Sequence, residues 1–361
     1  MVCFLDKREL VLSFNPPLID LHQDISLYYV LGGYGLKFKP ESFEVDLQGR
    51  HGDIPKFKRA NVRVVFSSIA HIIPTQNQFR LRQQVSGYGV KVGAMRIRSP
   101  TMITLEHIKT YYNLLTTHRD DLALLGDPSD LQQVEKKGKT WFLIAIEGAE
   151  PLEDIEDLDL FYMLGVRSLQ ITWNFDNKYA ATCMSKRDYG LTGDGEELIE
   201  RCNELGVIID LAHASKKSTI EALELSRLPA IVSHANASSV HRHVRNLDDD
   251  ELDALRKNGG VVGVTMIEPT LGGAADVKRV ADHIMYIFEN FGKNLVAIGT
   301  DFFGIMHVDE PKGLEDVTKF GNLWSELLSR GLTREDIELI AYRNALRVIM
   351  ANSVRWEPRI F

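Results

Sequence analysis

Cysteine is scarce in this chain. Three occur among 361 residues, as Cys3, Cys183 and Cys202. Their number is odd and their spacing is wide, which excludes the disulfide framework of small secreted proteins. They form no CxxC pair, so the cysteines do not predict a metal site. This usage favours a reducing compartment, and we expect a cytoplasmic protein.

The sequence also lacks the apolar segments that direct proteins to membranes or anchor them there. No run approaches the roughly 20 apolar residues that cross a bilayer. The first ten residues include Asp6, Lys7 and Arg8 and contain no signal-peptide core. The last nine, 353–361, are polar rather than an anchor tail. These absences favour a soluble protein without a membrane partner.

Positive charge is not in excess. The chain has 42 Lys and Arg against 50 Asp and Glu, for a formal net charge of -8. A general nucleic-acid binder normally carries a basic face, so no nucleic-acid partner is expected. The sequence contains no low-complexity segment and no repeat of 20–50 residues, which excludes solenoid architectures.

Short apolar runs alternate with helical patterns along the chain. Most of the runs are nearly continuous in apolar residues, as is typical of parallel strands buried on both faces. There are eight: Leu18–Leu21, Val62–Ile69, Trp141–Ile146, Val166–Ile171, Val207–Leu211, Ala230–Val232, Val261–Met266 and Leu295–Ile298. Helical patterns cover Thr101–His118, Gly195–Leu205, Ser218–Leu225, Asp249–Lys257 and Asp276–Phe291. This alternation predicts a single closed (β/α)₈ TIM barrel rather than an open sheet, and residues 1–361 are expected to form one domain.

Three local features complete the predicted architecture. Thr101 is the predicted N-cap of its helix. The polar stretch Leu36–Lys58 contains glycine and is predicted to be a long loop over the barrel mouth. Arg334–Met350 follows Gly331 and Thr333 and is predicted to be a capped terminal helix.

Titratable residues gather just after several of the apolar runs. Barrel enzymes carry their reacting groups at the carboxyl ends of the strands. His22 and Asp24 follow the first run, and alternate residues of a strand point the same way, so both can reach one metal ion. The other candidates follow later runs: Glu147, His213, His234 and Asp301.

Each of these residues also has an ordinary structural interpretation. His22 and Asp24 could belong to a surface turn, Glu147 could pair with a basic residue, and either later histidine could be a satisfied core residue. Their recurrence at the same end of so many strands favours a metal site. Three histidines and two or three carboxylates exceed what one catalytic ion takes from a protein, so we predict two divalent ions, zinc foremost, that share a carboxylate.

These residues lie in segments similar to one known family. The chain resembles the membrane (renal) dipeptidase family, the zinc peptidases of family M19, which is a branch of the amidohydrolase-type barrels. The matching segments keep the family's order over about residues 18–350: Ile19–Asp24, Ile146–Ala149, Leu164–Leu169, Leu205–His213, Ser233–Ala235, Arg245–Asp249 and Ile298–Gly304.

The resemblance implies a metal-dependent dipeptidase and a role for each residue. His22 and Asp24 would hold the first ion, His213 and His234 the second, and Glu147 would bridge them. A bridging hydroxide would attack the peptide bond of a dipeptide, and Asp301 would transfer the proton. Arg245 would bind the substrate's C-terminal carboxylate, since guanidinium presents a planar fork to a carboxylate. The resemblance also implies a homodimer.

One position departs from the family pattern. Many relatives have a substrate-contacting histidine after the fourth strand, where this chain has Trp173. An indole N–H donates one hydrogen bond and carries no positive charge. Trp173 is therefore expected either to bind substrate or to form a pocket wall.

Two other functions remain open on the sequence. One is an amidohydrolase-type enzyme that acts on a lactone, a cyclic amide or a nucleobase, because fold does not fix function. The other is a metal-binding homologue with impaired catalysis, as the change at Trp173 would allow. An intact Asp301 disfavours the second alternative.

Overall fold

The computed structural model describes residues 14–30, 40–71, 98–136, 138–305 and 309–358. Nine parallel strands form one sheet, and eight of them close into a ring in the order β1-β2-β4-β5-β6-β7-β8-β9. Pairing of β2 with β4 and of β1 with β9 completes the ring, while β3 pairs with the start of β4. The bounds are β1 Leu18–Gln23, β2 Val62–Ile69, β3 Leu122–Leu124, β4 Thr140–Glu147, β5 Val166–Gln170, β6 Ile208–Asp210, β7 Ile231–Ala235, β8 Val261–Val264 and β9 Val296–Ile298.

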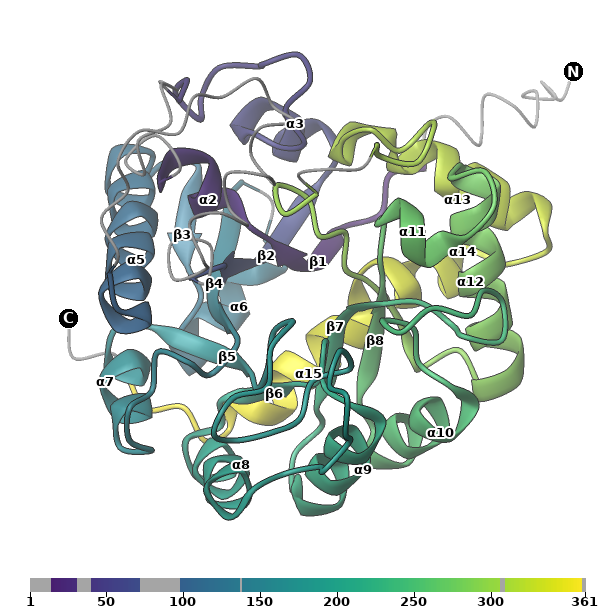
Figure 1. Ribbon diagram of the computed structural model, residues 1–361. Helices are drawn as coiled ribbons and strands as arrows, with labels where there is room; N and C mark the ends of the chain where they lie inside the picture. Colours follow the sequence, from purple (N-terminus) through teal and green to yellow (C-terminus); the bar gives the residue numbers. More distant parts are fainter. Residues whose placement is uncertain (1–13, 31–39, 72–97, 137, 306–308, 359–361) are drawn as a thin grey trace, which may run out of the picture.

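Helices surround the ring (Figure 1). The barrel strands are buried at every position, because side chains on one face fill the barrel and those on the other pack under helices. The α-helices are α2 Ile25–Val30, α3 Ile54–Arg59, α5 Pro100–Thr117, α6 Leu131–Val134, α7 Asp157–Met163, α8 Gly193–Leu205, α9 Lys216–Leu225, α10 Asp249–Asn258, α11 Glu268–Leu271, α12 Val277–Phe291, α13 Phe320–Ser329, α14 Arg334–Glu338 and α15 Asn344–Ser353. Short 3₁₀ turns at Pro128–Asp130 and Val317–Lys319 and a π-helical turn at Leu339–Arg343 complete the described elements.

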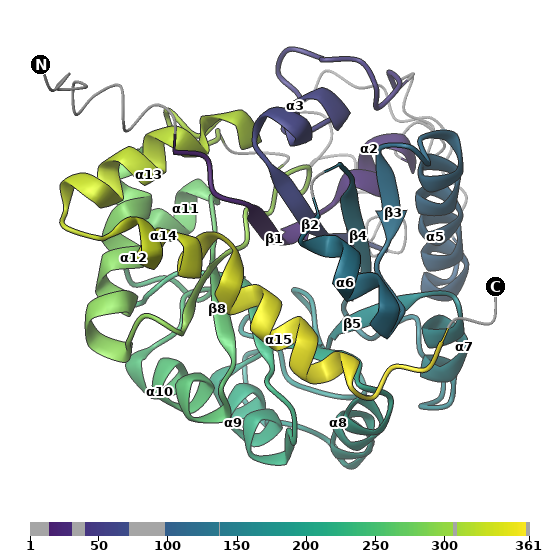
Figure 2. The same ribbon diagram turned by 180° about the vertical axis from the view of Figure 1, so that it is seen from behind.

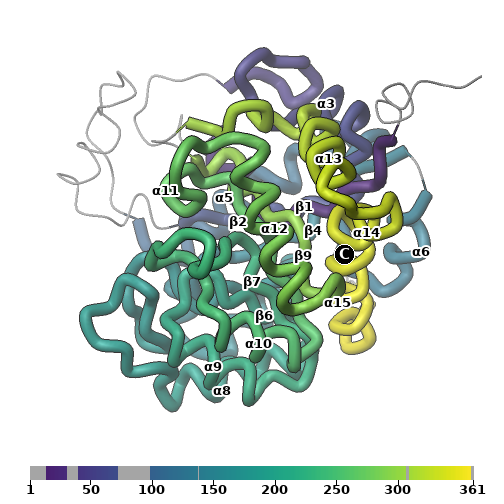
Figure 3. Tube along the Cα trace, turned by 90° about the vertical axis from the view of Figure 1, so that its right-hand side faces the viewer, coloured from purple at the N-terminus to yellow at the C-terminus, as the bar shows by residue number. Residues whose placement is uncertain are grey.

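The last helix, α15, crosses the back of the barrel (Figure 2). In the side view it lies on the side opposite α11 (Figure 3). Asn344, its first residue, donates from Nδ2 to the carbonyl oxygens of Lys293 and Val296 at the start of β9. One end of the barrel is therefore closed, and the opposite end, where the strands terminate, is left for chemistry.

The predicted barrel is confirmed, because each of the eight apolar runs overlaps one strand of the ring. The three-residue strand β3 was not predicted, since so short a run has no recognisable period. The predicted N-cap Thr101 is wrong: Ser99 precedes the helix, and its hydroxyl accepts from the Met102 N–H. The terminal helix starts as predicted after Thr333, passes through the π turn and ends at Ser353.

The predicted loop Leu36–Lys58 is partly wrong. Residues 36–39 lie outside the described residues, and 40–53 form neither helix nor strand. Helix α3 begins at Ile54 because Asp53 caps it, accepting from the Lys56 N–H, and Pro55 occupies the first turn. The capping sequence Asp53-Ile54-Pro55 is the signal that the loop prediction overlooked.

None of the helices in the described ranges combines the length and the apolar composition that a bilayer crossing needs. Cys183 and Cys202 both carry free thiols, and Cys3 lies outside the described residues.

Candidate metal centre and substrate cavity

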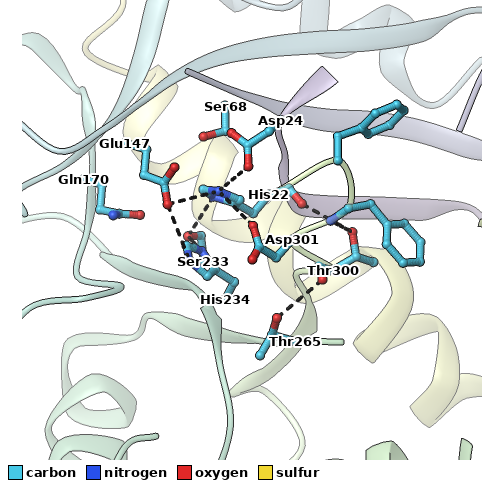
Figure 4. A network of polar contacts seen from close by, with 12 residues as sticks. His22, Asp24, Ser68, Glu147, Gln170, Ser233, His234, Thr265, Thr300 and Asp301 are labelled. Atoms are coloured by element: carbon cyan, nitrogen blue, oxygen red, sulfur yellow. Dashed lines mark hydrogen bonds and ion pairs between the residues drawn. The ribbon is translucent and has the colours of Figure 1, made fainter. Parts of the chain in front are cut away.

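Four of the predicted metal ligands, His22, Asp24, Glu147 and His234, lie close together (Figure 4). His22 lies in β1, Glu147 ends β4 and His234 lies in β7. Asp24, His213 and Asp301 follow β1, β6 and β9 within three residues. Parallel strands in a closed barrel all end at the same rim, which is why residues so distant in sequence become neighbours.

Glu147 lies at the centre of the three histidines. Its Oε1 is 3.6 Å from His22 Nε2, 3.5 Å from His213 Nε2 and 3.8 Å from His234 Nε2. The Nε2 atoms of His213 and His234 are 3.0 Å apart. One carboxylate oxygen therefore faces three imidazole nitrogens, as a shared metal ligand would.

His22 also faces the two aspartates. Its Nε2 lies 3.6 Å from Asp24 Oδ2 and 3.7 Å from Asp301 Oδ1. Two overlapping groups of ligand atoms result, each compact enough for one ion: His22 with Glu147 and His234, and His22 with Asp24 and Asp301. Nε2 of His22 belongs to both groups and can bind only one ion, whereas Glu147 has two carboxylate oxygens, so Glu147 is the residue that could join two ion positions.

Hydrogen bonds to the second ring nitrogen orient the histidines. His213 Nδ1 is 2.8 Å from Asn174 Oδ1. The hydroxyl of Ser233 is 2.8 Å from His234 Nδ1 and 3.4 Å from His22 Nδ1. Such contacts fix the ring orientation and leave Nε2 free to bind a metal ion.

Two residues of the site have strained backbones. His213 and Asp301 have φ values of 66° and 62°, in the left-handed region that residues other than glycine rarely adopt. The carbonyl of His213 is held by the N–H of Cys183 and the hydroxyl of Thr182. Strain of this kind persists where surrounding contacts maintain it, and it clusters at functional sites.

Burial dominates the electrostatics of the carboxyl groups. It raises the pKa of Glu147 well above its usual range, and the Asp24 charge raises it further. Burial and Asp24 likewise raise the pKa of Asp301 to about 7, against the opposing effect of His22. Crowded carboxylates without cations favour protons, which is the expected behaviour of a site built for positive ions.

The histidines divide into two kinds. Burial lowers the pKa of His213 and His234, and the positive charges of Arg245 and His22 lower it further, so both rings stay neutral, as metal ligands must. Burial also acts against protonation of His22, but Glu147 and Asp24 outweigh it and raise its pKa to about 10.

The residues present are suited to metal ions. His22 Nε2 and Asp24 Oδ1 are buried and have no hydrogen-bond partner. Buried polar atoms are almost always paired, so these two atoms are available to bind a metal ion. Imidazole nitrogen with carboxylate oxygen is a donor set that zinc and similar divalent ions accept.

A cavity of about 340 Å³ opens onto this cluster. Glu147, Asp24, His213 and Asp301 line one part of it, and Arg245 and Trp173 line it as well. The guanidinium of Arg245 donates from Nη2 to the carbonyl of His234, 3.0 Å away. The remaining wall is largely apolar: Leu27, Ala70, Met184, Ile267 and Pro269. The cavity thus has the size of a small-molecule site, with charge at one side.

Sequence reasoning missed the residues that support the ligands, namely Asn174, Ser233, Asp20 and Asp210. Asp20 accepts from the N–H groups of His22 and Thr300, and Asp210 accepts from those of Ala212 and Ser233. Each aspartate therefore ties one strand end to its neighbour. A lone aspartate inside an apolar strand was the signal available for both.

Comparison with known proteins assigns the family. A sequence model described as membrane dipeptidase (peptidase family M19) matches residues 7–356. The chain belongs to this family. Among its relatives, dipeptidase verJ of Clonostachys rogersoniana is 31% identical over 95% of this chain and 86% of its own length. An uncharacterized dipeptidase of Schizosaccharomyces pombe is 32% identical over 92% of this chain and 79% of its own length.

Solved structures share the fold of this family member. A metallopeptidase of Rhodobacter sphaeroides, solved with a phosphinate mimic of the dipeptide L-Ala-D-Ala, superposes with a TM-score of 0.77 at 22% identity, covering 94% of this chain and 99% of that one. The probable dipeptidase PvdM of Pseudomonas aeruginosa gives 0.78 at 20% identity, with 97% and 100% covered. At these identities the likeness concerns the barrel alone.

Proposed function

We propose that this chain is a metal-dependent dipeptidase that holds two divalent cations, zinc foremost. The observation that carries the proposal is the convergence of three imidazole nitrogens on one oxygen of Glu147, with unpartnered buried atoms on His22 and Asp24. His22 and Asp24 would hold one ion, His213 and His234 the other, and Glu147 both. Two such ions supply a water of lowered pKa as nucleophile and polarise the scissile carbonyl.

Asp301 is the proposed proton carrier. Its carboxylate lines the cavity, with Oδ1 3.7 Å from Nε2 of His22, a position that suits proton transfer from the attacking water to the leaving amine. The left-handed backbone and the hydrogen bond from its N–H to the carbonyl of His22 keep it in place.

Arg245 and Trp173 are the proposed substrate contacts. The guanidinium of Arg245 has five N–H donors. One of them donates to the carbonyl of His234, and others can therefore donate to a free carboxylate. Binding of the C-terminal carboxylate would select the last peptide bond of a peptide, and the cavity of about 340 Å³ would limit the length on the amino side of that bond. Together these two features would explain a preference for dipeptides. The dipeptide mimic bound by the Rhodobacter sphaeroides metallopeptidase supports this substrate class. Trp173 offers the substrate an apolar ring face and one hydrogen-bond donor, the indole N–H, and it carries no charge.

The test combines metal analysis with a substrate screen on one sample. Wild type loaded with zinc, cobalt or manganese should contain two equivalents of metal and hydrolyse dipeptides, but not lactones or cyclic amides. Glu147→Gln should lose metal and activity together, whereas Asp120→Asn, an exposed carboxylate outside the site, should lose neither. Full activity with one equivalent of metal, or faster lactone hydrolysis, would contradict the proposal.

Two further proposals concern the whole molecule. We propose a homodimer, which analytical ultracentrifugation can test, and a cytoplasmic location, which fits the scarcity of cysteine.

A further inference from the structure

The loop that carries Asp301 has a second strained residue. Phe303 has a φ of 68°, so two residues in the unfavourable left-handed region, Asp301 and Phe303, occur within three positions. Gly304 lies directly against the site: a Cβ there would come 2.4 Å from both Asp24 Oδ2 and Asp301 Oδ1. A small shift of this loop would therefore press backbone atoms against the two carboxylates.

Most contacts that hold the loop come from β1 or from the loop itself. The N–H of Asp301 donates to the carbonyl of His22, and the N–H of Gly304 donates to the carbonyl of Asp301. Phe303 is different, because its N–H donates over 2.8 Å to Nδ1 of His51, in the segment that precedes α3. A side chain some 250 positions away thus binds the backbone two residues from Asp301.

Several contacts fix the position of His51. Its ring stacks on Phe302 with centroids 4.7 Å apart and an angle of 5°, and it meets the ring of Phe303 edge-on. The carbonyl of His51 accepts from the N–H of Val317. The other ring nitrogen, Nε2, lies 2.5 Å from Oε1 of Glu310.

The hydrogen bonds determine the tautomer. A backbone N–H can only donate, so Nδ1 of His51 must present its lone pair to Phe303. The proton of the neutral ring therefore resides on Nε2 and is donated to Glu310. This hydrogen bond lowers the pKa of Glu310, which keeps its carboxylate ionised as an acceptor.

We propose that His51 and Glu310 act together as a positioning pair for Asp301. Glu310 fixes the tautomer and the ring of His51, and His51 fixes the backbone of Phe303, so that the Asp301 carboxylate stays where proton transfer requires it. Neither His51 nor Glu310 is among the residues found to line the cavity. Their effect passes through the loop, and the inference rests on the proposed role of Asp301.

The experiment compares variants of His51 in the metal-loaded enzyme. His51→Leu removes the acceptor, and kcat should fall about 10-fold to 100-fold, the penalty of a slightly misplaced catalytic group. KM should stay within about threefold and metal content should be unchanged, because the ligands and Arg245 are not altered. His51→Asn restores an acceptor near the position of Nδ1 and should recover most of the lost kcat. His118→Leu, at another buried histidine far from the site, should leave kcat at the wild-type value.

Glu310 provides a second test, in which the single substitution lies outside the core. Glu310 is partly exposed, and Glu310→Ala should lower kcat about 3-fold to 10-fold in the wild type but add nothing in the His51→Leu background, since both act through one contact. Equal kcat for His51→Leu and His51→Asn, additive losses at the two positions, or loss of metal in step with kcat would each overturn the pair. A wild type without dipeptide hydrolysis would instead overturn the proposed function.

Discussion

Replacing Asp301 by asparagine should raise the free energy of unfolding of the metal-free protein and should remove most of the activity of the metal-loaded enzyme. Burial raises the pKa of Asp301 from 3.8 to about 7. A carboxyl group whose pKa is higher in the folded state binds protons more tightly in the fold. The free energy of unfolding therefore falls as the pH rises from about 4 to about 7. The interval between the two pKa values corresponds to about 4 kcal/mol at neutral pH. Asparagine has no charge to bury, so it avoids that loss.

Urea unfolding of chelated protein at about pH 4.5 and about pH 8 measures the difference. The free energy of unfolding of Asp301→Asn should exceed that of the wild type by about 3 kcal/mol more at about pH 8 than at about pH 4.5. Asp120→Asn, which alters an exposed carboxylate, should show no such increase. In the metal-loaded enzyme, Asp301→Asn should lower kcat at least about 100-fold. An advantage that does not change with pH, or that shrinks as the pH rises, would refute the reasoning.

Three further substitutions test other parts of the site. Arg245→Met should lower kcat/KM for dipeptides about 10-fold to 100-fold, and much less for dipeptide amides, because a charge-assisted hydrogen bond to the substrate carboxylate is lost; steady-state kinetics on both substrate series checks this. Trp173→Ala should raise KM about 3-fold to 10-fold for dipeptides with bulky apolar side chains and leave KM for Gly-Gly unchanged, measured in the same assay. Gly299→Ala should lower the free energy of unfolding by about 1–3 kcal/mol, since a Cβ there would lie 1.7 Å from the carbonyl oxygen of Ser233; urea unfolding measures it.

The barrel could be predicted because its strands have a strong signal. A run such as Val62–Ile69 is apolar enough to be buried on both faces, and all eight positions of that strand are buried. Elements with weaker patterns could not be found this way. The strand Leu122–Leu124 has only three residues, too few to show a period. Helix α3 lies in a polar segment without an apolar pattern, although Asp53 and Pro55 mark its start.

Much of the candidate site was also accessible from sequence. The rule that strand ends meet at one rim predicted that His22, Glu147 and His234 lie together. In the structure, Nε2 of His22 and Nε2 of His234 lie 3.6 Å and 3.8 Å from Oε1 of Glu147. The supporting contacts were not accessible. Asn174 and His51 act through single hydrogen bonds whose geometry depends on loop conformation, and no period or spacing encodes such a contact.

The distribution of strain explains why the supporting residues matter. Among the described residues, three of the four non-glycine residues with a left-handed backbone lie at the rim of the site, namely His213, Asp301 and Phe303, and the fourth, Asn61, precedes β2. The same rim holds Glu147, a carboxyl group whose pKa is raised by burial. The opposite end is closed by α15, where Asn344 satisfies backbone carbonyls without strain. The barrel therefore separates stability from chemistry. Because the rim is costly without cations, binding of metal ions should stabilise the fold by mass action, and each supporting hydrogen bond keeps ligand atoms in place until the ions bind.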